Sequence, residues 1–257
     1  MSGGRLILAP HPDDESLGCG LLLATFSSKE PLHIAFVTDG AGQGPDRHRL
    51  AASREIEARR AAAVYGLGDE QLHFLRLPDG GLARLEMELA RLIRELVAVL
   101  RPATVHVPFR FDGHPDHLAV NRVACKLHDA GDLPASLLEY FVYTHSRMVP
   151  GRDVRKLIDP RWLTSIAAEP HAVLQRQRAL ECHSSQVSAA GGRWRPVLSP
   201  ELLARLASEP ERHLAYDPAV RGSGVLTQAR VWVPLAARLE PFLKYWTDRV
   251  LRRQPWP

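Results

Sequence analysis

The sequence is poor in cysteine and contains no long apolar segment. Its three cysteines, Cys19, Cys125 and Cys182, are widely spaced and form no C-x-x-C pair. This spacing argues against a disulfide framework or a zinc ion held by thiolates, and it favours a reducing compartment. No stretch approaches the roughly 20 apolar residues that cross a bilayer, and too few apolar residues follow the start for a signal peptide. We therefore expect a cytoplasmic protein without a membrane span.

Long blocks of one charge are also absent. The 33 Lys and Arg against 29 Asp and Glu give a formal net charge of +4, and both signs are mixed along the chain. This pattern does not indicate nucleic-acid binding, although it remains compatible with an anionic group on a small ligand. With 257 residues and 45% hydrophobic content the chain can bury one large core. We expect a single domain over 1–257, with a core at about 1–187 and a C-terminal elaboration at 188–257.

A dense group of polar residues, P-H-P-D-D-E at 10–15, follows a short apolar run at 5–9. The run is typical of a buried parallel strand, and the residues at 16–24 that come after the motif are typical of a helix. The motif therefore lies at the carboxyl end of a strand, which is the edge where sites form in open α/β sheets.

The residue types in this motif suit metal chemistry. His11 supplies an imidazole and Asp14 an oxygen ligand, while Asp13 between them is left as a nearby carboxylate. That combination fits zinc plus a general base. Taken alone, the acidic run Asp13, Asp14 and Glu15 favours electrostatic capping of the next helix over a metal site, so a second cluster is needed to support the metal site.

A second motif, H-P-D-H at 114–117, carries matching chemistry. It follows a β-branched run at 104–108 and precedes a helix-like segment at 118–124, so it also lies at a strand end. A lone His-x-x-His is as often structural as functional. Two such motifs at two strand ends together predict one metal site.

Short apolar runs alternate with helix-like segments along most of the chain, which indicates parallel strands joined by right-handed crossovers. We therefore expect an α/β fold with one Rossmann-like, mostly parallel sheet and helices on both faces. Leu23 stands where a dinucleotide-binding loop would need its third glycine, so a nucleotide cofactor is not expected. Further strands are expected at 32–38, 71–75, 137–143 and 229–233, and further helices at 49–65, 82–100, 170–181 and 201–207.

The two motifs resemble the signatures of the LmbE/PIG-L family of zinc-dependent de-N-acetylases, A-H-P-D-D-E and a later H-P-D-H-like element. Pro10 replaces the usual alanine, at a position without a ligand role. The sequence H-S-S-Q at 183–186 is similar to the family's H-x-S-Q element. The resemblance thus runs from the first strand to this point and becomes weaker beyond it.

The resemblance implies a role for each matching residue. His11, Asp14 and His117 are implied to bind zinc. Asp13 is implied to be the general base and His114, protonated, the acid that stabilises developing charge.

Three further residues are expected to support the reaction. Asp116 is expected to orient His114. Arg54 matches the family's R-x-x-E element and Asp79 resembles its loop aspartate, so both are expected to bind substrate. The alternative for Arg54 is a surface ion pair with Glu57, three residues further along a helix.

The function implied by the resemblance is a zinc-dependent amidohydrolase that removes the N-acetyl group from an N-acetylglucosamine-type amino sugar or glycoconjugate. One zinc ion per chain is expected, and other divalent metals should substitute because imidazole and carboxylate ligands discriminate weakly among them. Two alternatives stay open, a metal-dependent phosphoesterase and a noncatalytic sugar-binding protein on the same scaffold. The sequence leaves open the aglycone and the oligomeric state, including a homo-oligomer.

Overall fold

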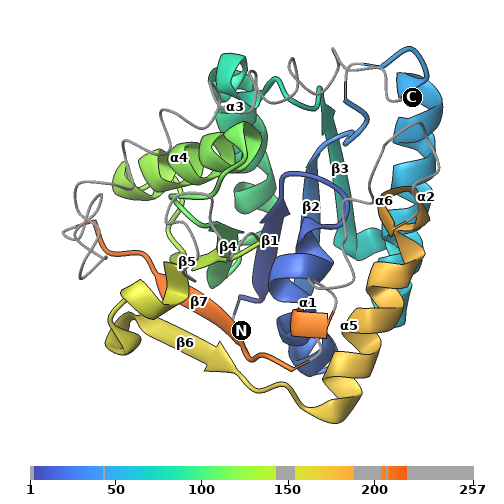
Figure 1. The fold of residues 1–257 in the computed structure, drawn as a ribbon. Coiled ribbons are helices and arrows are strands. Elements are labelled where there is room, and N and C mark those ends of the chain that lie inside the picture. The colour runs from blue at the N-terminus through green and yellow to red at the C-terminus, as the bar shows by residue number, and fades with distance from the viewer. Residues whose placement is uncertain (1–2, 43, 143–153, 188–203, 207, 219–257) are drawn as a thin grey trace, which may run out of the picture.

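The computed structural model describes residues 3–42, 44–142, 154–187, 204–206 and 208–218 (Figure 1). These residues form a seven-stranded sheet in the order β3-β2-β1-β4-β5-β7-β6, with helices on both faces. The strands are β1 Arg5–Ala9, β2 Leu32–Thr38, β3 Leu72–Leu77, β4 Thr104–Pro108, β5 Ser136–Tyr140, β6 Leu163–Ile166 and β7 Glu211–Ala215. The α-helices are α1 Asp14–Phe26, α2 Arg47–Val64, α3 Glu86–Leu100, α4 Pro115–Asp129, α5 Pro170–Cys182 and α6 Ser184–Val187. Short 3₁₀ helices lie at Asp69–Gln71, Leu82–Arg84, Val154–Leu157 and Pro160–Trp162.

The sheet has a parallel centre and an antiparallel edge. β1 pairs in parallel with β2 and β4, β2 with β3, and β4 with β5. β7 runs antiparallel to β5, and β6 runs antiparallel to β7. The expected α/β fold with a mostly parallel sheet and helices on both faces is therefore confirmed.

The sequence pattern does not predict β6 or β7. Glu211 and His213 occupy buried positions of β7, at 6% and 1% exposure, so β7 lacks the apolar run that identifies a buried strand. β6 has only four residues, and its two central positions are exposed. Because β7 lies inside the sheet, part of the expected C-terminal elaboration at 188–257 belongs to the core architecture.

Most expected elements are present with small changes in their bounds. β2 and β4 have the expected bounds, whereas α1 and α4 begin at Asp14 and Pro115, earlier than expected, so that each motif continues into its helix. β5 ends at Tyr140, so Phe141 and Val142 of its expected range lie outside the strand, whereas residue 143 and the strand expected at 229–233 fall outside the described residues. The helix expected at 201–207 is described at 204–206 only.

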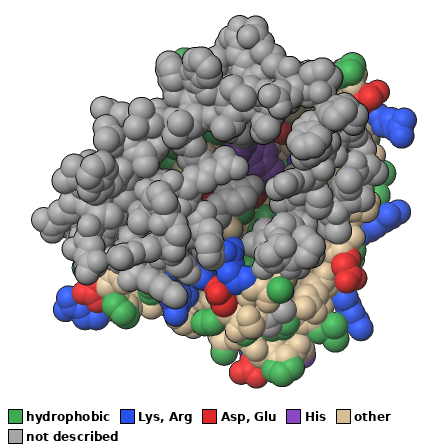
Figure 2. Space-filling model, viewed as in Figure 1, with side chains coloured by type: hydrophobic (Ala, Val, Ile, Leu, Met, Phe, Trp, Pro, Cys, Tyr) green, Lys and Arg blue, Asp and Glu red, His purple; other side chains and the backbone are tan. Residues whose placement is uncertain are grey.

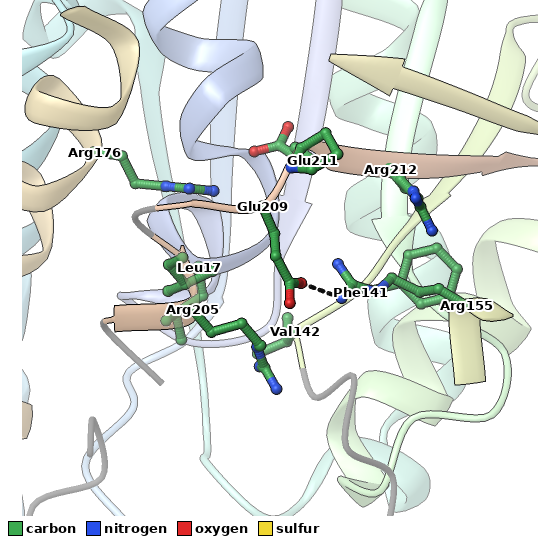
Figure 3. Close-up of a pocket in the computed structure, with 11 residues that line it drawn as sticks. Leu17, Phe141, Val142, Arg155, Arg176, Arg205, Glu209, Glu211 and Arg212 are labelled. Carbon is green, nitrogen blue, oxygen red and sulfur yellow. Dashed lines mark hydrogen bonds and ion pairs between the residues drawn. The ribbon is translucent and has the colours of Figure 1, made fainter. Parts of the chain in front are cut away.

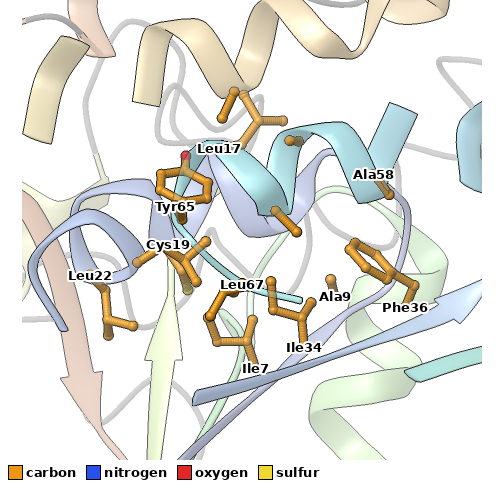
Figure 4. Close-up of a cluster of buried hydrophobic side chains, with 14 of the residues drawn as sticks. Ile7, Ala9, Leu17, Cys19, Leu22, Ile34, Phe36, Ala58, Tyr65 and Leu67 are labelled. Carbon is orange, nitrogen blue, oxygen red and sulfur yellow. The ribbon is translucent and has the colours of Figure 1, made fainter. Parts of the chain in front are cut away.

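Two apolar layers hold the helices to the sheet. On one face, Leu22 of α1, Ala58 of α2 and Leu180 of α5 pack in a cluster with Ile7 and Phe36 of the strands (Figure 4). On the other face, α3 and α4 bury Leu89, Ile93, Val97, Val120 and Val123 against the sheet. Completely burying one such leucine or valine contributes about 1.5–3 kcal/mol, so the layers fix the strand ends firmly. Within the part of the chain that the structure describes, no helix is long and apolar enough to cross a membrane.

The first helix, α1, is stabilised by Glu211 of β7. α1 is interrupted at Cys19, whose φ of −130° and ψ of 17° are not helical. The Glu211 carboxylate accepts hydrogen bonds from the backbone N–H groups of Leu21, at 2.7 Å, and Leu22, at 3.1 Å, just past the interruption. Glu211 therefore caps the second part of α1 from β7.

Replacing Glu211 with alanine is expected to lower the free energy of unfolding by about 2–3 kcal/mol, because two buried N–H groups lose a charged acceptor. Urea unfolding followed by circular dichroism measures the change. Glu209→Ala is the matched control, since the Glu209 side chain is two residues away, 38% exposed and paired with Arg155. Equal losses in the two variants would show that the cap contributes nothing specific.

Candidate metal centre and active site

The carboxyl ends of β1 and β4 bring the two sequence motifs together. The strands are neighbours in the sheet, with Ile7 paired to His106, so the turns that follow them lie at the same edge. His11 lies in the turn between β1 and α1, Asp14 begins α1, and His117 lies in the first turn of α4. Histidine side chains are visible on this face of the molecule (Figure 2).

His11, Asp14 and His117 form a triangle of donor atoms. Asp14 Oδ2 lies 3.1 Å from His11 Nδ1 and 3.1 Å from His117 Nε2. The two ring nitrogens are 3.3 Å apart. Ligands bound at about 2.0–2.2 Å in a tetrahedral zinc site lie roughly 3.3 Å from one another. The three atoms therefore have the spacing of ligands to one metal ion, and a tetrahedral ion held by these three would keep one coordination position open.

Carboxylates contact the other nitrogen of each ring. His11 Nε2 lies 3.2 Å from Asp79 Oδ1 and 3.3 Å from Asp116 Oδ2, and His117 Nδ1 lies 3.2 Å from Asp112 Oδ2. Metal-binding histidines are commonly oriented in this way by a carboxylate. Asp79, which was expected to bind substrate, contacts the His11 ring. Sequence analysis missed Asp112, although it precedes the second motif by only two residues.

The charges of this cluster suit a cation. Burial by itself lowers the pKa of His117, but the carboxylates of Asp112 and Asp14 outweigh it and raise the pKa to about 10. Burial by itself raises the pKa of Asp14, but His117 and His11 outweigh it and hold the pKa well below its usual range. A site that draws protons onto its imidazoles so strongly also favours a divalent metal ion in their place. The residues present therefore fit such an ion in both donor type and spacing.

Asp116 does not orient His114 in the way expected from the sequence. Its carboxylate accepts hydrogen bonds from the backbone N–H groups of Gly80, at 2.7 Å, and Leu82, at 3.1 Å, and contacts His11. The reason is that α4 begins at Pro115, which turns the Asp116 side chain toward the loop after β3. Asp116 thus ties that loop to a ligand ring.

His114 has a defined tautomer and is neutral. The backbone N–H of Asp116 donates to His114 Nδ1 at 3.3 Å, so Nε2 is the atom that carries the ring proton. Burial, together with the positive charges of His11 and His117, lowers the pKa of His114 to about 4. This direction favours a neutral ring with an N–H donor, in contrast to the protonated His114 expected from the sequence.

Arg54 is buried beside Asp13 and does not project into solvent. It is 4% exposed, its Nη2 lies 3.1 Å from Asp13 Oδ1, and it donates to the carbonyls of Gly40, at 2.6 Å, and Pro12. Gly40 has a φ of +62°, and a Cβ there would lie 2.8 Å from Arg54 Nη1, so glycine is required at this close approach. Arg54 therefore holds the Asp13 carboxylate and the loops around it, which differs from the expected contact with substrate.

Asp13 has a strained backbone that buried neighbours hold in place. Its φ of +136° with ψ of −25° costs on the order of 1–3 kcal/mol for a residue with a side chain. The carboxylate of Glu15, itself fully buried, accepts a hydrogen bond from the Asp13 N–H at 2.9 Å. His183 Nε2 lies 3.0 Å from the other oxygen of Glu15. Glu15 and His183 are thus supports of the turn that sequence analysis did not identify, although both lie in the motifs it singled out.

The environment of Asp13 suits a general base. Burial raises the pKa of Asp13 to about 6, while the Arg54 guanidinium opposes part of that rise. A carboxylate with this pKa is ionised at neutral pH and accepts a proton more readily than an exposed aspartate does.

Glu57 links α2 to the segment at 183–186. It is 6% exposed and accepts hydrogen bonds from Ser184 Oγ at 2.8 Å, Ser185 N at 2.8 Å and Ser185 Oγ at 2.7 Å. The alternative of a surface ion pair with Arg54 is therefore wrong. Both parts of the R-x-x-E element act inside the protein, Arg54 on Asp13 and Glu57 on the segment that contains His183.

Two pockets are found among the described residues. One, of about 230 Å³, includes Pro12 of the first motif and is lined further by Thr38, Asp39, Ala51, Ala52, Glu55, Phe74 and Arg76. The other, of about 20 Å³, has room for a single water molecule, is rich in arginine and includes an ion pair between Arg155 and Glu209 (Figure 3). Its arginines are Arg155, Arg176, Arg205 and Arg212. Only the first cavity includes a residue next to Asp13.

The chain matches known proteins over the region that contains both motifs. It matches the family model described as PIG-L, GlcNAc-PI de-N-acetylase, over residues 6–128. It is 26% identical over 252 residues to 1D-myo-inositol 2-acetamido-2-deoxy-alpha-D-glucopyranoside deacetylase of Thermobifida fusca (strain YX), with 76% of this chain and 87% of that protein covered. It is 33% identical over 134 residues to the uncharacterized deacetylase YaiS of Escherichia coli (strain K12), with 48% of this chain and 68% of that protein covered.

A solved structure shares the fold. The triple mutant of a deacetylase involved in the teicoplanin biosynthetic pathway superimposes with a TM-score of 0.64, covering 82% of this chain and 97% of that chain. The two sequences are 19% identical, so this likeness concerns the fold alone.

Proposed function

Because the chain belongs to the PIG-L family of de-N-acetylases, we propose that it hydrolyses the acetamide of an N-acetylglucosamine-type amino sugar or glycoconjugate with a bound zinc ion. The observation that carries the proposal is the triangle of His11, Asp14 and His117 next to the buried carboxylate of Asp13. A zinc ion held by the triangle would polarise the acetyl carbonyl and make a water molecule more acidic. The side chains around the triangle would transfer the protons and stabilise the negative charge that develops.

Asp13 is proposed to move the proton. It takes a proton from the attacking water as the new carbon–oxygen bond forms, and it delivers that proton to the amine nitrogen as the carbon–nitrogen bond breaks. The products are acetate and the free amino sugar. Arg54, at 3.1 Å, keeps the carboxylate in one orientation during both transfers.

His114 is proposed to stabilise the oxyanion that forms on the carbonyl oxygen. Its Nδ1 accepts from the Asp116 backbone, so its Nε2–H is the donor, and a neutral ring keeps that donor without adding a charge beside the metal. A fixed donor of this kind serves best in the transition state, where negative charge is greatest. The part of the substrate next to the acetamide would occupy the cavity that begins at Pro12.

The first test combines metal and substrate. Chelator is expected to remove the ion from the triangle and abolish acetate release, and zinc is expected to restore it, with other divalent metals restoring part. Acetate should be released from N-acetylglucosamine conjugates and not from acetyl-lysine peptides. Full activity in protein whose triangle is metal-free, or phosphatase activity without acetate release, would contradict the proposal.

The second test is the pH dependence. Since Asp13 must be ionised to act as the base, kcat/KM is expected to fall as pH drops through a pKa of about 6. Replacing Arg54 with methionine removes a positive charge that lowers this pKa, so the acidic limb should move to higher pH. Arg59→Met, on the same helix and paired with Glu55 near the surface, should leave the limb in place. A limb that shifts equally in both variants would argue against Asp13 as the titrating group.

A further inference from the structure

A second group of metal-ligating side chains lies inside the protein, apart from the de-N-acetylase site. It consists of Cys19 on α1, His106 on β4 and His213 on β7, which are 0%, 0% and 1% exposed. Each offers one ligand atom, and the three atoms lie within 4.8 Å of one another. The spacing of the cysteines along the sequence gives no hint of this group, because its three members come together only when β7 enters the sheet.

The His106 and His213 rings have the relative position of two ligands that bind the same ion. His106 Nδ1 and His213 Nδ1 lie 3.1 Å apart, and the rings are nearly perpendicular at 86°. Nitrogens bound at about 2.0–2.1 Å to a tetrahedral zinc ion lie roughly 3.3 Å apart. His213 Nε2 lies 2.9 Å from the Glu211 carboxylate, which is the arrangement that orients a metal-binding histidine through its other nitrogen.

Cys19 is the cysteine that has no hydrogen bond. Cys125 Sγ donates to Asn121 and Cys182 Sγ donates to the Arg178 carbonyl, but among the described residues Cys19 Sγ has no such partner. It lies in the apolar layer between α1 and the sheet (Figure 4), at the point where the helix is interrupted. A thiol there contributes only packing, whereas a thiolate would need a cation beside it.

We propose that Cys19, His106 and His213 form a closed site, meaning one shielded from solvent, for a thiolate-preferring transition-metal ion, such as zinc, that joins α1, β4 and β7. Binding releases the Cys19 thiol proton, and the His106 ring proton moves from Nδ1 to Nε2, so that both rings stay neutral and three lone pairs face the ion.

The competing arrangement is a chain of hydrogen bonds without a metal. Arg5 Nη1 lies 3.5 Å from His106 Nε2, so a proton donated there would leave His106 Nδ1–H to donate to His213, and His213 in turn to Glu211. This series of hydrogen bonds provides partners for both histidine rings but does not involve Cys19. A measurement that reports the thiolate therefore separates the two arrangements.

The experiment uses protein produced in cobalt-supplemented medium and then dialysed against a chelator. The triangle, which must be open to water and substrate, is expected to lose its ion, whereas the closed site should retain one cobalt ion per chain, with a thiolate-to-cobalt absorption band in the near ultraviolet. Cys19→Ser should lose both the retained ion and the band. Cys182→Ser is the matched control and should keep both, and His117→Ala should also keep the band because the closed site does not use that residue.

Two results would overturn the proposal. If the wild-type protein retains no cobalt after dialysis and shows no thiolate band, the three residues do not bind a metal and the hydrogen-bonded arrangement is the correct one. A band that survives in Cys19→Ser arises from another cysteine. Because the wild-type measurement decides by itself, the test stands even where Cys19→Ser folds poorly, and His106→Gln, checked by circular dichroism, supplies a second variant that should lose the band.

Discussion

Replacing His117 with alanine is expected to release the active-site metal and to abolish activity for that reason. The triangle has three donor atoms, with Asp14 Oδ2 and His117 Nε2 3.1 Å apart, so the change leaves only two protein ligands. It also leaves the buried carboxylate of Asp112 without the ring that it contacts at 3.2 Å. Metal content after dialysis against a weak chelator is the measurement, with acetate release assayed on the same sample. Asp14→Ala should behave in the same way.

His114→Ala is the matched comparison, three residues away in the same motif. The proposed role of His114 is to donate a hydrogen bond through Nε2, so this variant should keep its metal and lose turnover by roughly 10²–10⁴-fold. Metal lost from His114→Ala but retained by His117→Ala would exchange the two roles. That result would be structurally possible, since the His114 ring centroid lies 4.6 Å from that of His11.

Asp13→Asn is expected to lower kcat by roughly 10²–10⁴-fold while the metal stays bound. An amide has nearly the shape of the carboxylate and still accepts from Arg54, but it cannot take a proton from water. The triangle does not include the Asp13 side chain, so metal content should equal that of the unaltered protein. The acidic limb of the pH profile should also disappear, insofar as Asp13 is the group that titrates.

The matched control for this change is Asp132→Asn. Asp132 pairs with Arg94 at the surface, at 2.8 Å, and lies in no part of the site, so its replacement should change neither kcat nor metal content. If Asp13→Asn kept more than about a tenth of the activity, another group would have to act as the base.

The meeting of the two motifs could be predicted from the sequence, because parallel strands end at one edge of a sheet. His11, Asp14 and His117 therefore come together as expected, although their role as ligands stays a prediction. Side-chain direction could not be predicted in the same way. Whether Arg54 faces solvent or Asp13 depends on how α2 is rotated against the sheet, and R-x-x-E fixes only the spacing of two residues on that helix.

The parallel centre of the fold was predictable, and its antiparallel edge was not. β2 and β4 are continuous apolar or β-branched runs, which the sequence displays directly. β7 buries a glutamate and a histidine because Glu211 caps α1 and His213 faces His106, and both contacts join residues far apart in the chain. When long-range contacts determine which residues a strand buries, its local sequence does not show the apolar pattern by which a strand is recognised.

The strand order also sets the sequence of events as the chain leaves the ribosome. β6 is synthesised before β7, yet among the described strands it pairs with β7 alone, and β7 separates it from β5. Until residues 211–215 emerge, β5 and β6 both present unpaired backbone groups, and the second part of α1 lacks the acceptor that Glu211 supplies. Open strand edges recruit other chains. A nascent chain that pauses between 166 and 211 is therefore the form of this protein most exposed to aggregation.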